Sequence, residues 1–219
     1  MSEKRFDMGE AIRFGWNTMK ANFWFFVGIL LVVWVVQAIP EIISKVWEEN
    51  LILSLILQFV SMVIGLLVGL GLIKIALTFI RNEKPLFSDL FSCTNLLINY
   101  IAATMLYSLM VVGGLILLIV PGIILGIKFQ FYSYFIVEKN CGPIEALKMS
   151  AAITKGVKLD LFVLSLTLIG INLLGMLALV VGLFATFPAT MIAFAYVYRK
   201  LAGSLEGVES PGAGTAPTA

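Results

Sequence analysis

The sequence predicts an all-α integral membrane protein with six transmembrane helices and three interfacial amphipathic helices. Of its 219 residues, 60% are hydrophobic and only 13% are charged, whereas soluble domains are nearer half apolar and a quarter charged. Several unbroken apolar runs exceed the roughly 18 residues that mark a membrane span. The basic residues flank these runs mainly on one side, as membrane topology requires.

Composition also excludes several functional classes. The formal net charge is +2 and the basic residues are dispersed, so the basic stripe of a nucleic-acid-binding protein is missing. The chain has no histidine, which excludes a His-ligated haem or zinc and an imidazole general base. We therefore expect no metal and no cofactor. Cys93 and Cys141 lack CxxC spacing, and on the cytosolic side, where we expect both, thiols stay reduced.

The first third of the chain predicts one surface helix and two spans. Residues 6–22 alternate apolar and charged positions at helical spacing, which is typical of an interfacial helix. The first span is 23–39. The second apolar run, 51–80, would reach about 45 Å as a helix, longer than a hydrocarbon layer of about 30 Å. It must tilt, protrude or break, and Gly65, Gly69 and Gly71 mark the expected place for a break or for close helix contact.

The middle third repeats this order. Residues 86–97 carry a leucine stripe opposite a polar one, which predicts a second surface helix. The third span is 98–120, and a short fourth span is 122–137. A third surface helix over 143–155 begins at Pro143, because a proline at the first helical position loses no hydrogen bond.

The last third predicts a fifth span over 159–187 and a short sixth span that ends at Tyr198. Residues 1–202 then form a single transmembrane helical domain. Residues 203–219 are small, polar and proline-bearing, which predicts a disordered cytosolic tail.

These thirds predict a threefold helix-hairpin repeat. Each contains a surface helix, a span, a proline turn and a return span. The prolines expected at the turns are Pro40, Pro121 and Pro188, and the acids expected near the starts of the surface helices are Glu10, Asp89 and Glu145.

The basic residues orient the predicted topology. In a six-span arrangement, one side has a single basic residue, Lys45, and Lys74 and Lys128 lie inside spans. The positive-inside rule therefore places both termini in the cytosol. The basic residues of the cytosolic side are Lys4, Arg5, Arg13, Lys20, Arg81, Lys84, Lys139, Lys148, Lys155, Lys158, Arg199 and Lys200.

Two lysines inside spans are the candidate binding residues. Lys128 lies about seven residues, roughly 10 Å, beyond Pro121, and an ionisable group at that depth usually faces a cavity, a partner or a ligand. Lys74 lies at a similar depth. If both converge, they would bind an anion such as a lipid phosphate, with Gln130 beside Lys128 and with Asp160 as a partner for either lysine. The alternative is that both lysines snorkel to an interface and that Asp160 caps its helix.

Two small-xxx-small pairs are candidates for close helix packing. They are Gly65 with Gly69 and Gly122 with Gly126, and packing within one chain is the default over dimerisation. Neutral polar residues inside the apolar runs are expected to form hydrogen bonds between helices, and these are Gln58, Asn99, Gln130 and Asn172.

A resemblance adds to this interpretation. The chain resembles uncharacterised bacterial polytopic membrane proteins that are similar to the membrane domain of glycerophosphoryl diester phosphodiesterases. That resemblance implies a six-helix module in a bacterial plasma membrane. The chain lacks a soluble phosphodiesterase domain and every histidine, so hydrolytic activity is not carried over. The segments that carry the resemblance are Pro121-Gly122-Ile123, Glu145 to Ser150, Thr154-Lys155-Gly156, Pro188 and Tyr198-Arg199.

Two functions follow as hypotheses. The leading one is a non-enzymatic membrane protein that binds or moves an anionic amphiphile, with a lipid as the first candidate. The alternative is a structural or assembly subunit of a larger membrane complex, with a membrane protein as partner. An intramembrane enzyme has no support, because the sequence shows no paired carboxylates, metal cluster or nucleophile with its base.

Overall fold

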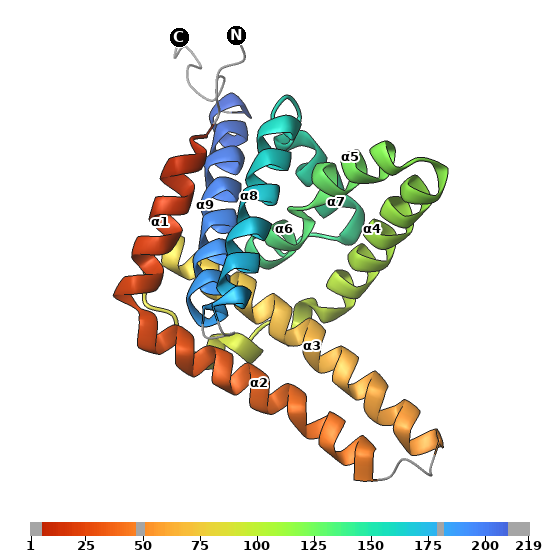
Figure 1. Cartoon of the computed structure of the whole chain (residues 1–219). Helices are drawn as coiled ribbons and strands as arrows, with labels where there is room; N and C mark the ends of the chain where they lie inside the picture. The colour runs from red at the N-terminus through yellow and green to blue at the C-terminus, as the bar shows by residue number, and fades with distance from the viewer. Residues whose placement is uncertain (1–5, 47–50, 179–181, 210–219) are drawn as a thin grey trace, which may run out of the picture.

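The computed structural model of the chain describes residues 6–46, 51–178 and 182–209. Within these ranges every regular element is helical (Figure 1). The α-helices are α1 (Met8–Ala21), α2 (Phe23–Val46), α3 (Leu51–Ile80), α4 (Leu97–Leu117), α5 (Ile119–Phe129), α6 (Tyr132–Lys139), α7 (Pro143–Ile153), α8 (Lys158–Leu177) and α9 (Leu183–Glu209), and the 3-10 helices are η1 (Phe87–Phe91) and η2 (Thr94–Leu96).

Five segments of the described chain are long and apolar enough to cross a membrane. One of them combines α5 and α6, and another combines η1, η2 and α4. The predicted sixth span corresponds to α9, which is not among the five. The five segments are Phe23–Ile43, Leu51–Ile80, Phe87–Leu117, Ile119–Lys139 and Lys158–Leu177.

Helix α9 lies at the centre of the fold and packs against α1, α3 and α8 (Figure 1). Its buried face combines small and branched residues, including Ile192, Ala193 and Val197. The helix continues to Glu209, so the first part of the predicted tail, 203–209, is helical. Residues 210–219, the rest of that predicted tail, lie outside the described residues.

Helix α1 was predicted as an interfacial helix, and in the structure it packs along α9. The backbones meet closely at Gly15, where an added Cβ would collide with the carbonyl oxygen of Ala189. The buried stripe of α1 is Ala11, Gly15 and Met19. Small residues allow two helices to approach closely.

The predicted proline turns are wrong, because all three prolines lie inside helices. Pro40 is inside α2 and Pro188 is inside α9. Pro121 is in the first turn of α5, where a missing N–H leaves no backbone bond unmade. The break between α4 and α5 falls at Leu118, whose backbone is extended. The threefold repeat, which used these turns, stays a prediction.

The connection between α8 and α9 also comes earlier than predicted. Helix α8 ends at Leu177 and α9 begins at Leu183, so the predicted fifth span over 159–187 contains a turn. Gly175 lies against Thr186 so closely that a Cβ would collide with its side chain. A stretch of uniform hydropathy gives no signal for this turn.

Helix α3 is unbroken over all of its 30 residues. Of the three predicted outcomes for this long run, a break is therefore wrong, and tilting or protrusion remains. With α2 it forms a hairpin whose far end lies away from the other helices (Figure 1). Side chains at that end, including Leu51 and Ile52, are exposed. The other end is packed in the core through Ile75 and Phe79.

Residues 86–97 were predicted as one surface helix and instead form η1 and η2. These short helices fold back onto α3, and Leu90 and Leu96 are buried. Gly71 of α3 makes this approach possible, because a Cβ there would collide with the backbone of Leu90. The short elements bring polar residues of η1 next to the C-terminal part of α3.

Candidate functional site

A polar cavity lies beside the C-terminal part of α3. Its volume is about 290 Å³, and we call it the Lys74–Arg81 cavity. Lys74, Leu77, Thr78 and Arg81 line it at the spacing of one helical face. The other lining residues are Glu83, Lys84, Leu86, Asp89, Val137 and Glu138.

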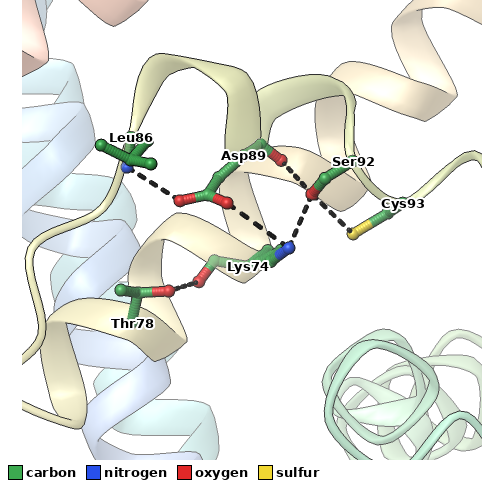
Figure 2. Close-up of polar contacts among 6 residues, drawn as sticks. All are labelled: Lys74, Thr78, Leu86, Asp89, Ser92 and Cys93. Carbon is green, nitrogen blue, oxygen red and sulfur yellow. Dashed lines mark hydrogen bonds and ion pairs between the residues drawn. The ribbon is translucent and has the colours of Figure 1, made fainter.

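Lys74 is held by η1 (Figure 2). Its Nζ donates a hydrogen bond to Ser92 Oγ at 2.7 Å and lies 3.4 Å from Asp89 Oδ1. The other carboxylate oxygen of Asp89 accepts the backbone N–H of Leu86 at 2.8 Å. The lysine that the sequence placed at span depth therefore has an anionic partner from a neighbouring element.

Glu138 is the centre of a second polar cluster. Its Oε1 accepts hydrogen bonds from Arg81 Nη2 at 3.0 Å and from Arg199 Nη1 at 2.8 Å. Its Oε2 accepts one from the Tyr198 hydroxyl at 2.6 Å. These bonds join the end of α3 to α6 and α9. We call these four residues the Glu138 cluster.

The Glu138 cluster carries more positive than negative charge. The Glu138 side chain is 10% exposed, whereas Arg81 and Arg199 are 43% and 53% exposed. A guanidinium has further N–H donors in a planar fork that fits carboxylate or phosphate oxygens. Because each arginine gives a single donor nitrogen to Glu138, other N–H groups remain on the exposed side.

A third polar feature lies where α5 ends and α6 begins. The Ser150 hydroxyl on α7 donates to the carbonyl oxygen of Lys128 at 3.1 Å and accepts the backbone N–H of Phe131 at 3.1 Å. Thr154 Oγ1 donates to the same carbonyl oxygen at 3.0 Å. Irregular backbone at membrane depth needs such partners inside the protein.

The predicted site residues are therefore divided among three places. Lys74 lines the cavity, and Lys128 and Gln130 lie at the α5–α6 break. Lys128 Nζ is 4.9 Å from the centre of the Phe129 ring, and Gln130 Nε2 is buried without a hydrogen-bond partner in the described chain. Asp160 is in the first turn of α8. No hydrogen bond or ion pair of the described residues joins any two of the four.

The predicted packing glycines also differ in their surroundings. Gly122 meets the backbone of Gly114 and the side chain of Leu115, so α5 and α4 touch there. The carbonyl oxygen of Gly126 accepts the Tyr107 hydroxyl at 3.4 Å. Gly65 has no atom within 4 Å of an added Cβ. A Cβ on Gly69, the fourth glycine, would meet only the Tyr100 hydroxyl, at 3.7 Å.

Arg81, Glu138 and Arg199 were not predicted as site residues. The two arginines contributed only to the predicted orientation, and Glu138 directly follows the predicted fourth span, 122–137. A signal was available, because Tyr198-Arg199 is among the segments that carry the family resemblance. The distance along the chain, 57 and 61 residues from Glu138 to the arginines, hides the contact.

A family model matches residues 105–204, from α4 to α9. Its description is "Protein of unknown function (DUF975)". Uncharacterised proteins of Mycobacterium bovis and Mycobacterium tuberculosis are 32% identical over 126 residues. That alignment covers 57% of this chain but only 38% of each relative. No solved structure matches the chain.

The family match contains part of the candidate site. It includes Lys128, Ser150 and two elements of the Glu138 cluster, α6 and α9, and leaves out α1 to α3. The matched names mention no phosphodiesterase, so the similarity to that membrane domain stays a prediction. The comparisons support a resemblance to uncharacterised bacterial proteins.

Proposed function

We propose that this protein is a non-enzymatic, six-span membrane protein that binds an anionic amphiphile, a lipid, at the Lys74–Arg81 cavity. The observation that carries the proposal is the gathering of Lys74, Arg81 and Lys84 around one cavity at the end of the apolar helix α3. Basic pockets between membrane helices hold anionic lipid headgroups on the cytosolic side.

The ion pairs within the cavity leave basic groups that could bind a headgroup phosphate. Asp89 pairs with Lys74, and Glu138 pairs with Arg81. Neither these two acids nor Glu83, the third acid of the lining, forms an ion pair with Lys84 in the described chain. A headgroup phosphate would bind Lys84 together with the exposed N–H groups of Arg81. Leu77, Leu86 and Val137 in the wall would contact the apolar part of the amphiphile.

The six-span topology takes α9 as the last span. Helix α9 returns alongside α8, where Asn172 Nδ2 donates to Thr190 Oγ1 at 3.1 Å. The hydroxyl of Tyr196 donates to Glu10, so α1 begins beside the later part of α9 (Figure 1). Both described ends then lie on one side. The basic bias assigns that side to the cytosol of a bacterial plasma membrane.

Lipid selectivity of the purified chain tests this function. The full chain is reconstituted in phosphatidylcholine vesicles with a spin-labelled phosphatidylglycerol, and the motionally restricted fraction is measured. We expect the double variant Arg81→Gln, Lys84→Gln to lose selectivity for phosphatidylglycerol by about thirtyfold, since each of the two basic residues contributes about 1 kcal/mol. The double variant Lys148→Gln, Lys155→Gln is the matched control, because it removes the same two charges from exposed sites elsewhere.

Two results would contradict the proposal. Unchanged selectivity in the double variant would exclude the cavity, and a loss confined to Lys128→Met would move the site to the α5–α6 break. Copurification of a stoichiometric membrane protein, without lipid selectivity, would favour the alternative of an assembly subunit.

A further inference from the structure

One face of α3 changes character along its length. Three polar residues, Ser54, Gln58 and Ser61, follow one another at spacings of four and three. The same stripe continues through Gly65, Gly69 and Leu72. All of these residues line hollows between α3 and α2. The face that α3 turns toward α2 is therefore polar at its N-terminal end and small or apolar further on.

The apolar part of this face forms one wall of a groove. The groove lies between α2, α3 and the start of α9 and has a volume of about 600 Å³, within the range of ligand sites. Val33 and Trp34 of α2 line it opposite Gly65, and Phe187 of α9 closes one side. We call it the apolar groove. The groove is open at Gly65, because a Cβ there would meet nothing within 4 Å.

The polar part forms a second hollow of about 370 Å³. Ser54, Gln58 and Ser61 line it from α3, and Glu41 of α2 lines both this hollow and the apolar groove. We call it the serine–glutamine cavity. The two hollows share a wall residue and therefore adjoin.

Two polar groups of the serine–glutamine cavity lack a hydrogen-bond partner in the described chain. They are the side-chain amide of Gln58 and the hydroxyl of Ser61. Both residues lie inside the candidate span Leu51–Ile80. A polar group that faces hydrocarbon without a partner is costly. This pairing of unsatisfied hydrogen-bonding groups with an adjoining apolar groove indicates a polar-headed apolar ligand.

The lining also restricts the charge of that ligand. No lysine or arginine is among the described residues that line either hollow, and the one ionisable group is Glu41. Without a basic partner among these residues, an anionic headgroup is not favoured there, whereas serine and glutamine side chains donate to and accept from hydroxyl groups. The chemistry fits an uncharged headgroup that carries a hydroxyl.

We propose that the apolar groove and the serine–glutamine cavity bind an uncharged, hydroxyl-bearing lipid such as a diacylglycerol. Its acyl chain lies along Gly65 and Gly69, and its headgroup binds Gln58 and Ser61. This site is separate from the Lys74–Arg81 cavity. Gly65 and Lys74 are nine residues apart, which puts them on opposite faces of α3, so the two sites select different headgroups.

Quenching of Trp34 fluorescence tests the proposal. Trp16, Trp24 and Trp47 are replaced by phenylalanine in the full chain, which leaves Trp34 as the single tryptophan. The protein is placed in phosphatidylcholine vesicles that contain increasing amounts of diacylglycerol brominated on its acyl chains. We expect saturable quenching that is about fivefold stronger than with brominated phosphatidylcholine, the preference that one additional hydrogen bond gives.

Two variants separate binding of the acyl chain from binding of the headgroup. Gly65→Leu should abolish the saturable quenching by filling the groove, and Gln58→Leu should remove the preference for diacylglycerol while some quenching remains. Gly170→Leu is the matched control, since its added Cβ also meets nothing within 4 Å but lies on α8.

Each result of the quenching experiment either supports or overturns the diacylglycerol site. Quenching that rises linearly with every brominated lipid and ignores Gly65→Leu would overturn the proposal. Stronger quenching by brominated phosphatidylglycerol than by diacylglycerol would also overturn it and would leave the proposed anionic function intact. Loss of phosphatidylglycerol selectivity at Arg81 with retained diacylglycerol quenching would show that the two sites are independent.

Discussion

The hydroxyl of Ser150 donates a hydrogen bond to the carbonyl oxygen of Lys128 across 3.1 Å. Ser150 is fully buried, and the same hydroxyl accepts the N–H of Phe131. It thereby takes over hydrogen bonds that a continuous α5–α6 helix would make internally. Helix α7 consequently belongs to the core of the bundle, although its sequence indicated a surface helix.

Replacing Ser150 should destabilise the fold. Ser150→Ala leaves the Phe131 N–H without its acceptor, and an unsatisfied buried group costs about 1–3 kcal/mol. We expect a lower unfolding temperature in detergent. Ser108→Ala, at an exposed position of α4, should leave the unfolding temperature unchanged. An equal effect of the two variants would contradict this role of Ser150.

Glu138 should couple energetically to both arginines. Glu138→Ala removes the acceptor of three hydrogen bonds, and we expect a loss of about 1–3 kcal/mol in the free energy of unfolding. The half-exposed arginines limit the loss, because solvent replaces part of the pairing. A double-mutant cycle of Glu138→Ala with Arg199→Gln measures the pair. If the effects of the two single variants simply add in the double variant, the contact between Glu138 and Arg199 does not contribute to stability.

The six-span topology predicts opposite compartments for successive loops. Reporter fusions at residues 45 and 140 should lie on different sides, and so should fusions at residues 180 and 209. The second pair tests α9, whose hydropathy does not qualify it as a span. If residues 180 and 209 report the same compartment, α9 does not cross the membrane.

The thiol of Cys141 should react slowly at neutral pH. Burial raises the pKa of this thiol, and the nearby Glu145 raises it further. A raised pKa lowers the fraction of reactive thiolate at any given pH. In a Cys93→Ser background, alkylation by iodoacetamide should therefore accelerate only as the pH rises above the ordinary thiol range.

A charge change next to Cys141 checks the cause. Glu145→Gln should speed alkylation at a fixed pH, because it removes a negative charge that disfavours the thiolate. Glu83→Gln, which removes the same charge from another exposed site, should have no effect. Fast labelling of Cys141 at pH 7 in the folded chain would contradict the prediction.

The parts of the fold that depend on local composition could be predicted from the sequence. Helix α3 matches the predicted run 51–80, and Pro143 opens α7 as expected. The predicted proline turns were wrong. A proline is compatible with the first turn of a helix, where Pro121 lies, and Pro40 and Pro188 lie inside α2 and α9. No local pattern marks Leu118 as the break.

The candidate site depends on contacts between distant segments. Lys74 was predicted from its depth in an apolar run, but its partner Asp89 comes from η1, which folds back onto α3 at Gly71. The convergence of Lys74 with Lys128, on which the predicted anion site rested, needed a tertiary arrangement that periodicity does not encode. The hydroxyl of Ser150, which α7 contributes to the α5–α6 break, was likewise not predicted to bind the backbone there.

The contact between α1 and α9 has a consequence for biosynthesis. Glu10 and Tyr196 are separated by 186 residues, so the ribosome must produce nearly the whole chain before α1 can reach its final position. Until then, its amphipathic face needs another apolar environment, and the membrane surface provides one. We therefore expect α1 to lie at the membrane surface until α9 has been made, and the packing of α1 on α9 to be the last step of assembly.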